Sequence, residues 1–328
     1  MSGGPEPASE GDLFTRIREA CAEVARRARH VRIEDAALDD FAGHLARERP
    51  RLPDVDPTHQ RLGSPERTVA FVVSMNAVNF GSGWFPHLRK RPGLSGYLTL
   101  AGALRERFER TGPLSAAELA SIDAAGCARL FGQPLEPPVD ELMRLYAQAW
   151  NDLGRLLQQR HRGRFEALVG AAGGRAGRLV EILAQMPLYR DVARYQGLVV
   201  PFYKRAQITA SDLALALGGR GAGRFADLDR LTLFADNLVP HVLRMLGVLA
   251  YDLRLVMRIE AGELLPWGSE EEVEIRAVAL HAVERLAASC ARRGFSIGAH
   301  RLDHLLWSRG QHPKIKAHPR HRTRCPYY

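Results

Sequence analysis

The sequence predicts a mainly helical protein with a few short strands at most, and three observations support this. Apolar residues recur at helical spacing in several long segments. Patterns that alternate like a strand are scarce, and no run of turn residues is long enough to act as a linker. The 328 residues are 46% hydrophobic and 25% charged, which excludes a disordered chain and allows a large core.

The first predicted helix begins after Asp12, because aspartate favours the N-cap position. Leu13, Phe14, Ile17 and Cys21 then lie on one face. The residues before it are small and acidic rather than basic and then apolar, so residues 1–10 are expected to be a disordered tail and no secretion signal. Residues 11–328 are expected to form one helical domain.

Later elements follow the same logic. The segment 140–160 repeats the helical spacing with leucines on one face. Ser269 and Glu272 form the pattern of a capping box, which predicts the start of a long helix that Gly294 ends. The best short strand is the segment 197–203, with the sequence GLVVPFY.

The apolar runs and the cysteines indicate the expected cellular location. No uninterrupted apolar run approaches the roughly 20 residues of a membrane span, so no membrane partner is expected. The cysteines are far apart and form no C-x-x-C pair, which predicts free thiols in a reducing, cytoplasmic compartment. They are Cys21, Cys127, Cys290 and Cys325.

The net charge of +9 is concentrated at one end of the chain. Seven of the lysines and arginines lie in residues 301–328, against one acid, Asp303. Such a concentration favours a phosphate-bearing partner, either a nucleotide or a nucleic acid. A solvated basic surface explains the same excess equally well. The seven cations are Arg301, Arg309, Lys314, Lys316, Arg320, Arg322 and Arg324.

Two stretches suggest a binding site for a planar, anionic ligand. In the segment 76–86, Phe80 and Trp84 can stack on a heterocycle while Asn79 reads its edge, although aromatic residues at a helix end are also ordinary core. Lys204 and Arg205 follow an apolar run, so at least one cation emerges near the interior. A buried cation needs either a protein carboxylate or an anionic ligand.

Two further stretches carry carboxylates. Asp236 and Asn237 lie in an apolar neighbourhood shortly before Pro240. Such a carboxylate either caps the following helix or acts as an acid–base or cation-stabilising group. Asp303 lies close to Trp307 in the last helical segment. The histidines of the basic terminus match no common zinc spacing, so no metal is expected.

Four motifs in order resemble the queuosine salvage family. They are V-P-F-Y-K-R-A-Q-I at Val200–Ile208, L-T-x-F-A-D-N-x-V-P at Leu231–Pro240, D-x-x-L-W at Asp303–Trp307 and C-x-Y-Y at Cys325–Tyr328. The resemblance runs from about Asn79 to the last residue.

This resemblance implies a helical fold similar to helix-hairpin-helix DNA glycosylases and a hydrolysis that needs no cofactor. Queuosine 5′-phosphate would be split into queuine and ribose 5-phosphate, so that the base can be reused for tRNA. Asp236 would be the catalytic carboxylate, Lys204 would line the nucleotide site, and residues 79–84 would surround the base. The remaining residues implied at the substrate site are Arg205, Asn237, His241, Asp303, Trp307 and Tyr328.

The residue types suit this chemistry independently. Loss of the base leaves positive charge on the ribose, which a carboxylate stabilises. The 5′-phosphate would be neutralised by Lys204 and Arg205 with some of Arg301, Arg309 or Arg324. Two alternatives stay open at this point: a non-catalytic helical tRNA-binding protein, and a glycosylase for another modified nucleoside. For the enzyme, nucleic-acid binding would be weak or incidental.

Overall fold

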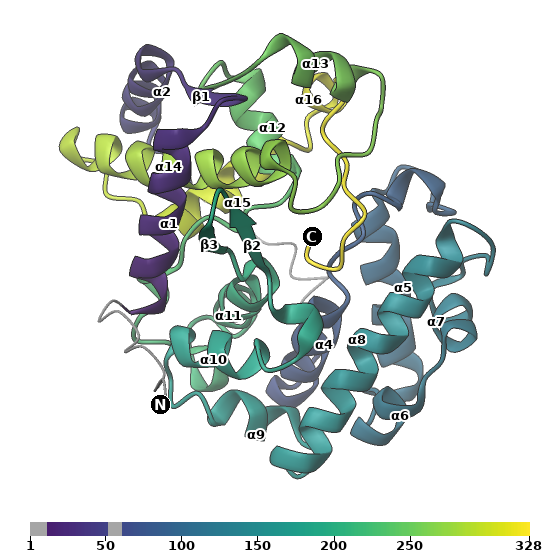
Figure 1. Cartoon of the computed structure of the whole chain (residues 1–328). Helices are drawn as coiled ribbons and strands as arrows, with labels where there is room; N and C mark the ends of the chain where they lie inside the picture. The colour runs from purple at the N-terminus through teal and green to yellow at the C-terminus, as the bar shows by residue number, and fades with distance from the viewer. Residues whose placement is uncertain (1–11, 52–60) are drawn as a thin grey trace, which may run out of the picture.

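The computed structural model describes residues 12–51 and 61–328 and is mainly helical, as predicted (Figure 1). The expected tail at residues 1–10 lies outside the described residues. None of the described helices combines the length and the apolar character needed to cross a membrane.

Helices extend along the whole described chain. The α-helices are α1 (Leu13–Arg27), α2 (Asp35–Glu48), α4 (Pro65–Ala77), α5 (Gly96–Thr111), α6 (Ala116–Ser121), α7 (Ala124–Phe131), α8 (Val139–Arg160), α9 (Phe165–Gly170), α10 (Ala176–Leu183), α11 (Lys204–Ala216), α12 (Leu238–Met245), α13 (Leu253–Glu260), α14 (Glu270–Arg292), α15 (Ala299–Arg309) and α16 (Pro313–Lys316). Short 3₁₀ turns are η1 (Phe85–His87), η2 (Pro187–Tyr189), η3 (Gly221–Gly223) and η4 (Leu228–Arg230).

The strands of the described residues form two small antiparallel pairs. β1 (Val31–Ile33) pairs with β4 (Leu249–Tyr251), and β2 (Val192–Tyr195) pairs with β3 (Leu198–Pro201) in a hairpin. The predicted strand at 197–203 is therefore confirmed in its central part. Gln196 and Gly197 both have positive φ, as a two-residue hairpin turn requires.

The predicted helix starts are confirmed with one difference. The Asp12 side chain accepts hydrogen bonds from the backbone N–H groups of Phe14 and Thr15. The Ser269 side chain accepts one from the backbone N–H of Glu272. The Glu272 carboxylate, however, accepts from the N–H of Gly268 rather than from that of Ser269. The helix α14 therefore begins as predicted, but Glu272 takes part in a buried network described below.

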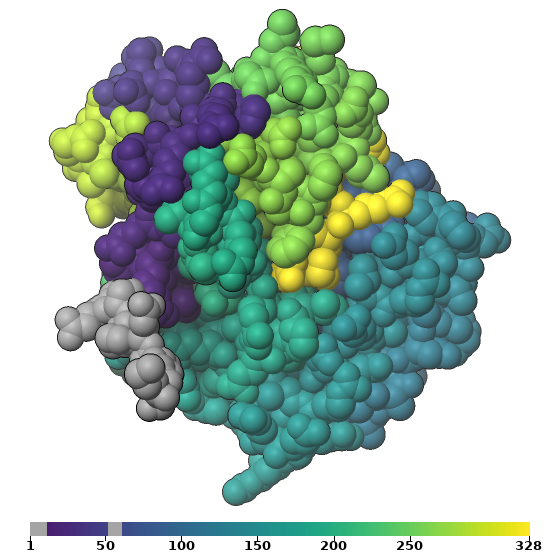
Figure 2. All heavy atoms as spheres, in the orientation of Figure 1, coloured from purple at the N-terminus to yellow at the C-terminus, as the bar shows by residue number. Residues whose placement is uncertain are grey.

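The elements form two regions on either side of the β2–β3 hairpin in Figure 1. One region holds α1, α2, α12, α13 and α14, and the other holds α4 to α10. The C-terminal segment runs between the two regions and is visible at the surface in Figure 2. One continuous set of buried apolar side chains spans both regions.

In the second region, α6 packs very closely on α8. A Cβ atom at Gly154 of α8 would lie 2.6 Å from the carbonyl oxygen of Ala116 and would also meet the backbone nitrogen of Ala120. Backbone atoms of a packed helix cannot move aside as a flexible side chain does. Glycine is therefore required at this crossing.

We predict that Gly154→Ala lowers the free energy of unfolding by about 2 kcal/mol or more, because the added methyl group overpacks the crossing. Gly170→Ala is the matched control, since a Cβ there has nothing within 4 Å. That change should be neutral or stabilising by up to about 1 kcal/mol. Urea unfolding of both variants measures the difference, and equal stabilities would contradict the packing argument.

Candidate active site

A buried guanidinium lies at the centre of the molecule. Arg276 of α14 is 0% exposed and forms a bidentate ion pair with Asp191, with N–O distances of 3.0 and 2.6 Å. Glu272 lies 3.5 Å away, and the rings of Phe202 and Tyr328 lie on the guanidinium at 3.9 and 4.6 Å. Asp191 and Glu272 hold the pKa of Arg276 above its usual value despite its burial. The cation is therefore fully paired.

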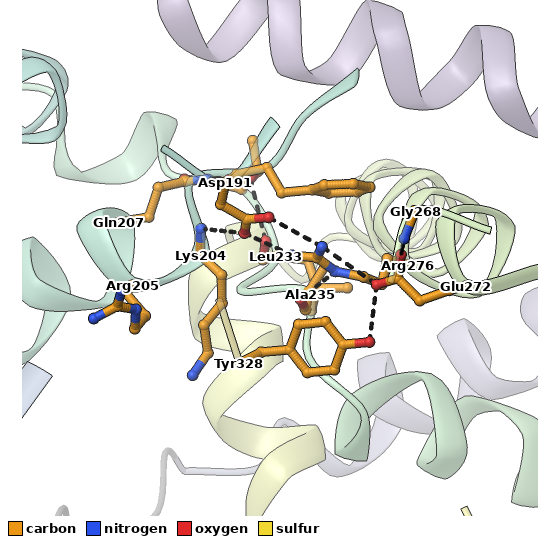
Figure 3. A network of polar contacts seen from close by, with 12 residues as sticks. Asp191, Lys204, Arg205, Gln207, Leu233, Ala235, Gly268, Glu272, Arg276 and Tyr328 are labelled. Carbon is orange, nitrogen blue, oxygen red and sulfur yellow. Dashed lines mark hydrogen bonds and ion pairs between the residues drawn. The ribbon is translucent and has the colours of Figure 1, made fainter. Parts of the chain in front are cut away.

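This network connects the two segments that carry the predicted site residues. Asp191 accepts a hydrogen bond from the backbone N–H of Lys204, at 3.2 Å, where α11 begins. The Nε of Arg276 donates to the carbonyl oxygen of Ala235, at 3.0 Å, next to Asp236. Figure 3 shows the Lys204 side chain extending away from Asp191 while its backbone nitrogen faces the carboxylate. One guanidinium thus helps to fix both segments.

Asp236 lies at the start of α12 and is half-buried. Its Oδ1 accepts hydrogen bonds from the N–H groups of Leu238, at 2.7 Å, and Val239, at 3.2 Å. Its Oδ2 accepts no hydrogen bond from the described residues. The carboxylate therefore caps the helix and still offers one oxygen to a ligand, so that the two interpretations of the sequence are compatible.

Lys204 and Asp303 lie in the electrostatic neighbourhood of Asp236 and are only 5% and 4% exposed. Burial lowers the pKa of the Lys204 amino group, and Asp236 and Asp303 partly oppose this shift. Burial, together with the charge of Asp236, raises the pKa of Asp303 well above its usual value. Asp303 accepts a hydrogen bond from the N–H of Phe234 at 3.1 Å.

A chain of amides positions the backbone opposite Lys204. The Nζ of Lys204 donates to the carbonyl oxygen of Asn79 at 3.4 Å. The side chain of Asn79 donates to Asn76, which in turn donates to Asp212, each at 2.9 Å. Asn79 therefore reaches the site through its backbone, and its side-chain nitrogen is held by Asn76.

Three other predicted residues have partners within the protein. The guanidinium of Arg205 donates to the carbonyl oxygens of Asn76, Ala77 and Leu188 and lies over the Phe80 ring at 4.7 Å. Phe80 and Trp84 are both 1% exposed, and the Trp84 indole donates to Glu141. The Arg205 guanidinium is therefore bound by backbone carbonyl oxygens, two of them at the end of α4, rather than by a protein carboxylate.

Of the last four predicted residues, Tyr328 belongs to the C-terminal segment, and Asn237 and His241 contact this segment. Asn237 donates to the carbonyl oxygen of His321 at 3.3 Å, and His241 contacts that of Ile315 at 3.1 Å. Tyr328 donates to Glu272 at 2.8 Å, and its carbonyl oxygen accepts from Gly81 and Ser82. Trp307 is half-buried and lies edge-to-face with Tyr97. Of these residues, Tyr328 belongs to the Arg276 network.

Sequence reasoning missed Arg276, Asp191 and Asp212. An i,i+4 pair of Glu272 and Arg276 in a helix has the pattern of a solvated face, so no local signal marked it as buried. Two surface hollows, beside α7 and along α13, are lined by none of the residues around Asp236. The site is thus defined by buried charge.

One group in the described chain has the composition of a metal site. Ligand atoms of His30, Glu270 and Glu274 lie within 4.8 Å of one another. The Glu274 carboxylate, however, already accepts hydrogen bonds from the N–H groups of Arg29, His30 and Val31 and from the hydroxyl of Tyr195. These hydrogen bonds stabilise the buried Glu274 carboxylate without a metal ion, so we infer no metal site there.

The fold and these side chains define a mainly helical protein with a buried carboxylate site of the kind that hydrolytic enzymes use. Residues 58–328 match the family model described as queuosine salvage protein. The chain belongs to this family.

Three relatives illustrate the similarity. A queuosine 5′-phosphate N-glycosylase/hydrolase of Sphaerobacter thermophilus is 37% identical over 93% of this chain and 95% of its own. Proteins with the same name from Dictyostelium discoideum and Mus musculus are 31% and 30% identical. Those alignments cover 96% and 81% of this chain and 99% and 83% of the relatives.

We predict that Asp303→Asn removes a pH-dependent loss of stability. The pKa of Asp303 is raised in the folded protein. As the pH rises, the Asp303 carboxyl therefore loses its proton at a lower pH in the unfolded chain than in the folded protein. The wild type therefore loses stability above the ordinary carboxyl pKa. The asparagine keeps an acceptor for Phe234 but does not titrate.

Urea unfolding at pH 5, 7 and 9 measures this effect. The free energy of unfolding of the variant, relative to the wild type, should increase with pH by about 1 kcal/mol or more. Asp40→Asn, which removes an exposed carboxyl from α2, is the control for a general change of charge. A difference that stays constant with pH would show that Asp303 is not held protonated by its surroundings.

Proposed function

We propose that this protein hydrolyses the N-glycosidic bond of queuosine 5′-phosphate and releases queuine and ribose 5-phosphate. The family and the names of the relatives support this substrate. The observation that carries the proposal is the half-buried Asp236 carboxylate, which has one oxygen free of hydrogen bonds from the described residues and lies near buried Lys204.

The chemistry of the bond explains why this carboxylate matters. As the base departs, positive charge develops on the ribose, and an anionic oxygen beside it stabilises the transition state. Oδ1 of Asp236 is fixed by two backbone N–H groups, so Oδ2 can face the sugar without reorganisation. The same oxygen can orient the attacking water. The water oxygen bonds to the anomeric carbon as the bond from this carbon to the base nitrogen breaks, the water gives up a proton, and the departing nitrogen gains one from solvent.

Lys204 and Asp303 complete the proposed site. Queuine is a 7-deazaguanine and lacks the N7 atom at which guanine is protonated, so the departing base depends on other polar contacts. Lys204 would offer N–H groups to the nucleotide and balance the carboxylates around it. Asp303 would form an ion pair with the secondary ammonium of the queuine side arm. Without substrate, burial raises the pKa of Asp303, and the ammonium would supply a cation that favours the charged carboxylate.

The proposal extends to fold, domain organisation and cellular location. We expect a fold similar to helix-hairpin-helix DNA glycosylases, one domain over residues 11–328, and no cofactor or metal in the reaction. The helical architecture supports the first expectation. The described cysteines are free and buried, which suits a reducing, cytoplasmic compartment.

The alternative of a tRNA-binding protein receives less support. Two arginines of the basic segment have partners within the protein: Arg309 pairs with Glu48, and Arg322 donates to the carbonyl oxygen of Gly262. They do not form a free basic surface. Any nucleic-acid binding is expected to be incidental.

We predict that purified protein releases queuine from queuosine 5′-phosphate and that Asp236→Asn lowers kcat by about 10²- to 10³-fold. The asparagine oxygen can still cap α12, so fold and nucleotide binding should be retained. Chromatography of released queuine and calorimetric binding measure the two effects. Asp229→Asn, an exposed carboxyl earlier in the same region, is the control. Turnover by Asp236→Asn close to the wild-type rate would remove the carboxylate from the mechanism.

A further inference from the structure

Arg320 lies beside the loop that carries Asp236. It follows α16 in the C-terminal segment, and two hydrogen bonds hold this segment in place. Asn237 donates to the carbonyl oxygen of His321 at 3.3 Å, and the carbonyl oxygen of Arg322 accepts from Leu265 at 2.9 Å. The two residues after Arg320 are therefore held in place, and His321 is bonded directly to Asn237, the neighbour of Asp236.

Arg320 is half-buried, yet within the described part of the chain its guanidinium makes no hydrogen bond and no ion pair. Burial lowers its pKa, and the charge of Asp236 opposes this shift. Its neighbours His241 and His321 have lowered pKa values, that of His321 falling to about 3, so both are neutral at pH 7. A partly desolvated cation without a partner is costly, which indicates that it has a ligand.

Three of the other cations expected to bind phosphate have partners elsewhere in the protein, and the fourth is exposed. Arg205 donates to backbone carbonyl oxygens, Arg309 pairs with Glu48, and Arg324 lies 4.0 Å from Glu141. Arg301 is exposed. Lys204 and Arg320 both lie in the electrostatic neighbourhood of Asp236. Lys204 donates to the carbonyl oxygen of Asn79, whereas Arg320 makes no hydrogen bond to the described residues.

We propose that Arg320 binds the 5′-phosphate of the nucleotide substrate, an inference that rests on the proposed function. The phosphate and the anomeric carbon belong to the same ribose, so a cation close to Asp236 is within reach of the phosphate. A phosphate dianion entering beside Asp236 also needs a cation to offset repulsion between the two anions. Arginine suits this task because its planar fork binds two phosphate oxygens at once.

The test compares two substrates in three variants. For Arg320→Ala, kcat/KM for queuosine 5′-phosphate should fall about 10- to 100-fold, mainly through KM, while kcat/KM for the nucleoside queuosine stays unchanged. Arg320→Lys keeps the charge but loses the fork, so its loss should be smaller. Lys314→Ala, which removes an exposed cation from the same segment, is the matched control and should leave both substrates unaffected.

A binding experiment separates this proposal from the proposed function. Calorimetry with ribose 5-phosphate should show binding to the wild type and to Lys314→Ala, with at least a 10-fold weaker Kd for Arg320→Ala. Equal losses for nucleotide and nucleoside, or unchanged ribose 5-phosphate binding in Arg320→Ala, would overturn the assignment of Arg320. Intact, Arg320-dependent binding of ribose 5-phosphate without queuine release would instead contradict the proposed reaction alone.

Discussion

The burial of Arg276 is the constraint on which the rest of the site depends. A guanidinium with no exposed surface is tolerated only if its charge and its donors are matched, and Asp191, Glu272 and the carbonyl oxygen of Ala235 supply that match. The ring faces of Phe202 and Tyr328 cover it from water. Removing one partner of such a network leaves an uncompensated buried charge, which typically costs about 3–5 kcal/mol. The surrounding segments are therefore held in one arrangement.

This arrangement has a functional consequence. Asp236 and Lys204 are separated along the chain and lie at the starts of different helices, so neither helix alone can set their relative position. Arg276 contacts the residue before Asp236 and, through Asp191, the first backbone nitrogen of α11. Tyr328 extends the same network to the turn after Asn79. Displacement of a catalytic group by about 1 Å can cost on the order of 100-fold in rate, so this positioning matters for catalysis.

Sequence reasoning recovered local features well and long-range ones poorly. The helical character, the Asp12 and Ser269 caps and the short strand before Lys204 follow from local patterns, and the structure confirms them. The Arg276 network has no such signal, because Glu272 and Arg276 look like an exposed helical pair. Likewise, no local signal showed that Gly83 packs against the carbonyl of Thr323, more than 200 residues further along the chain. That residues 79–84 surround the base stays a prediction. The roles of Asp236 and Lys204 in catalysis remain predictions from motif and geometry.

The most direct test of the positioning account is the kcat of Arg276→Lys with queuosine 5′-phosphate, measured at a temperature where circular dichroism shows the variant to be folded. Lysine keeps the charge but cannot reach both Asp191 oxygens and the Ala235 carbonyl together. The account predicts a folded enzyme whose kcat is about 10- to 100-fold lower than that of the wild type. A folded variant that turns over at the wild-type rate would show that Asp236 and Lys204 are held in place without Arg276.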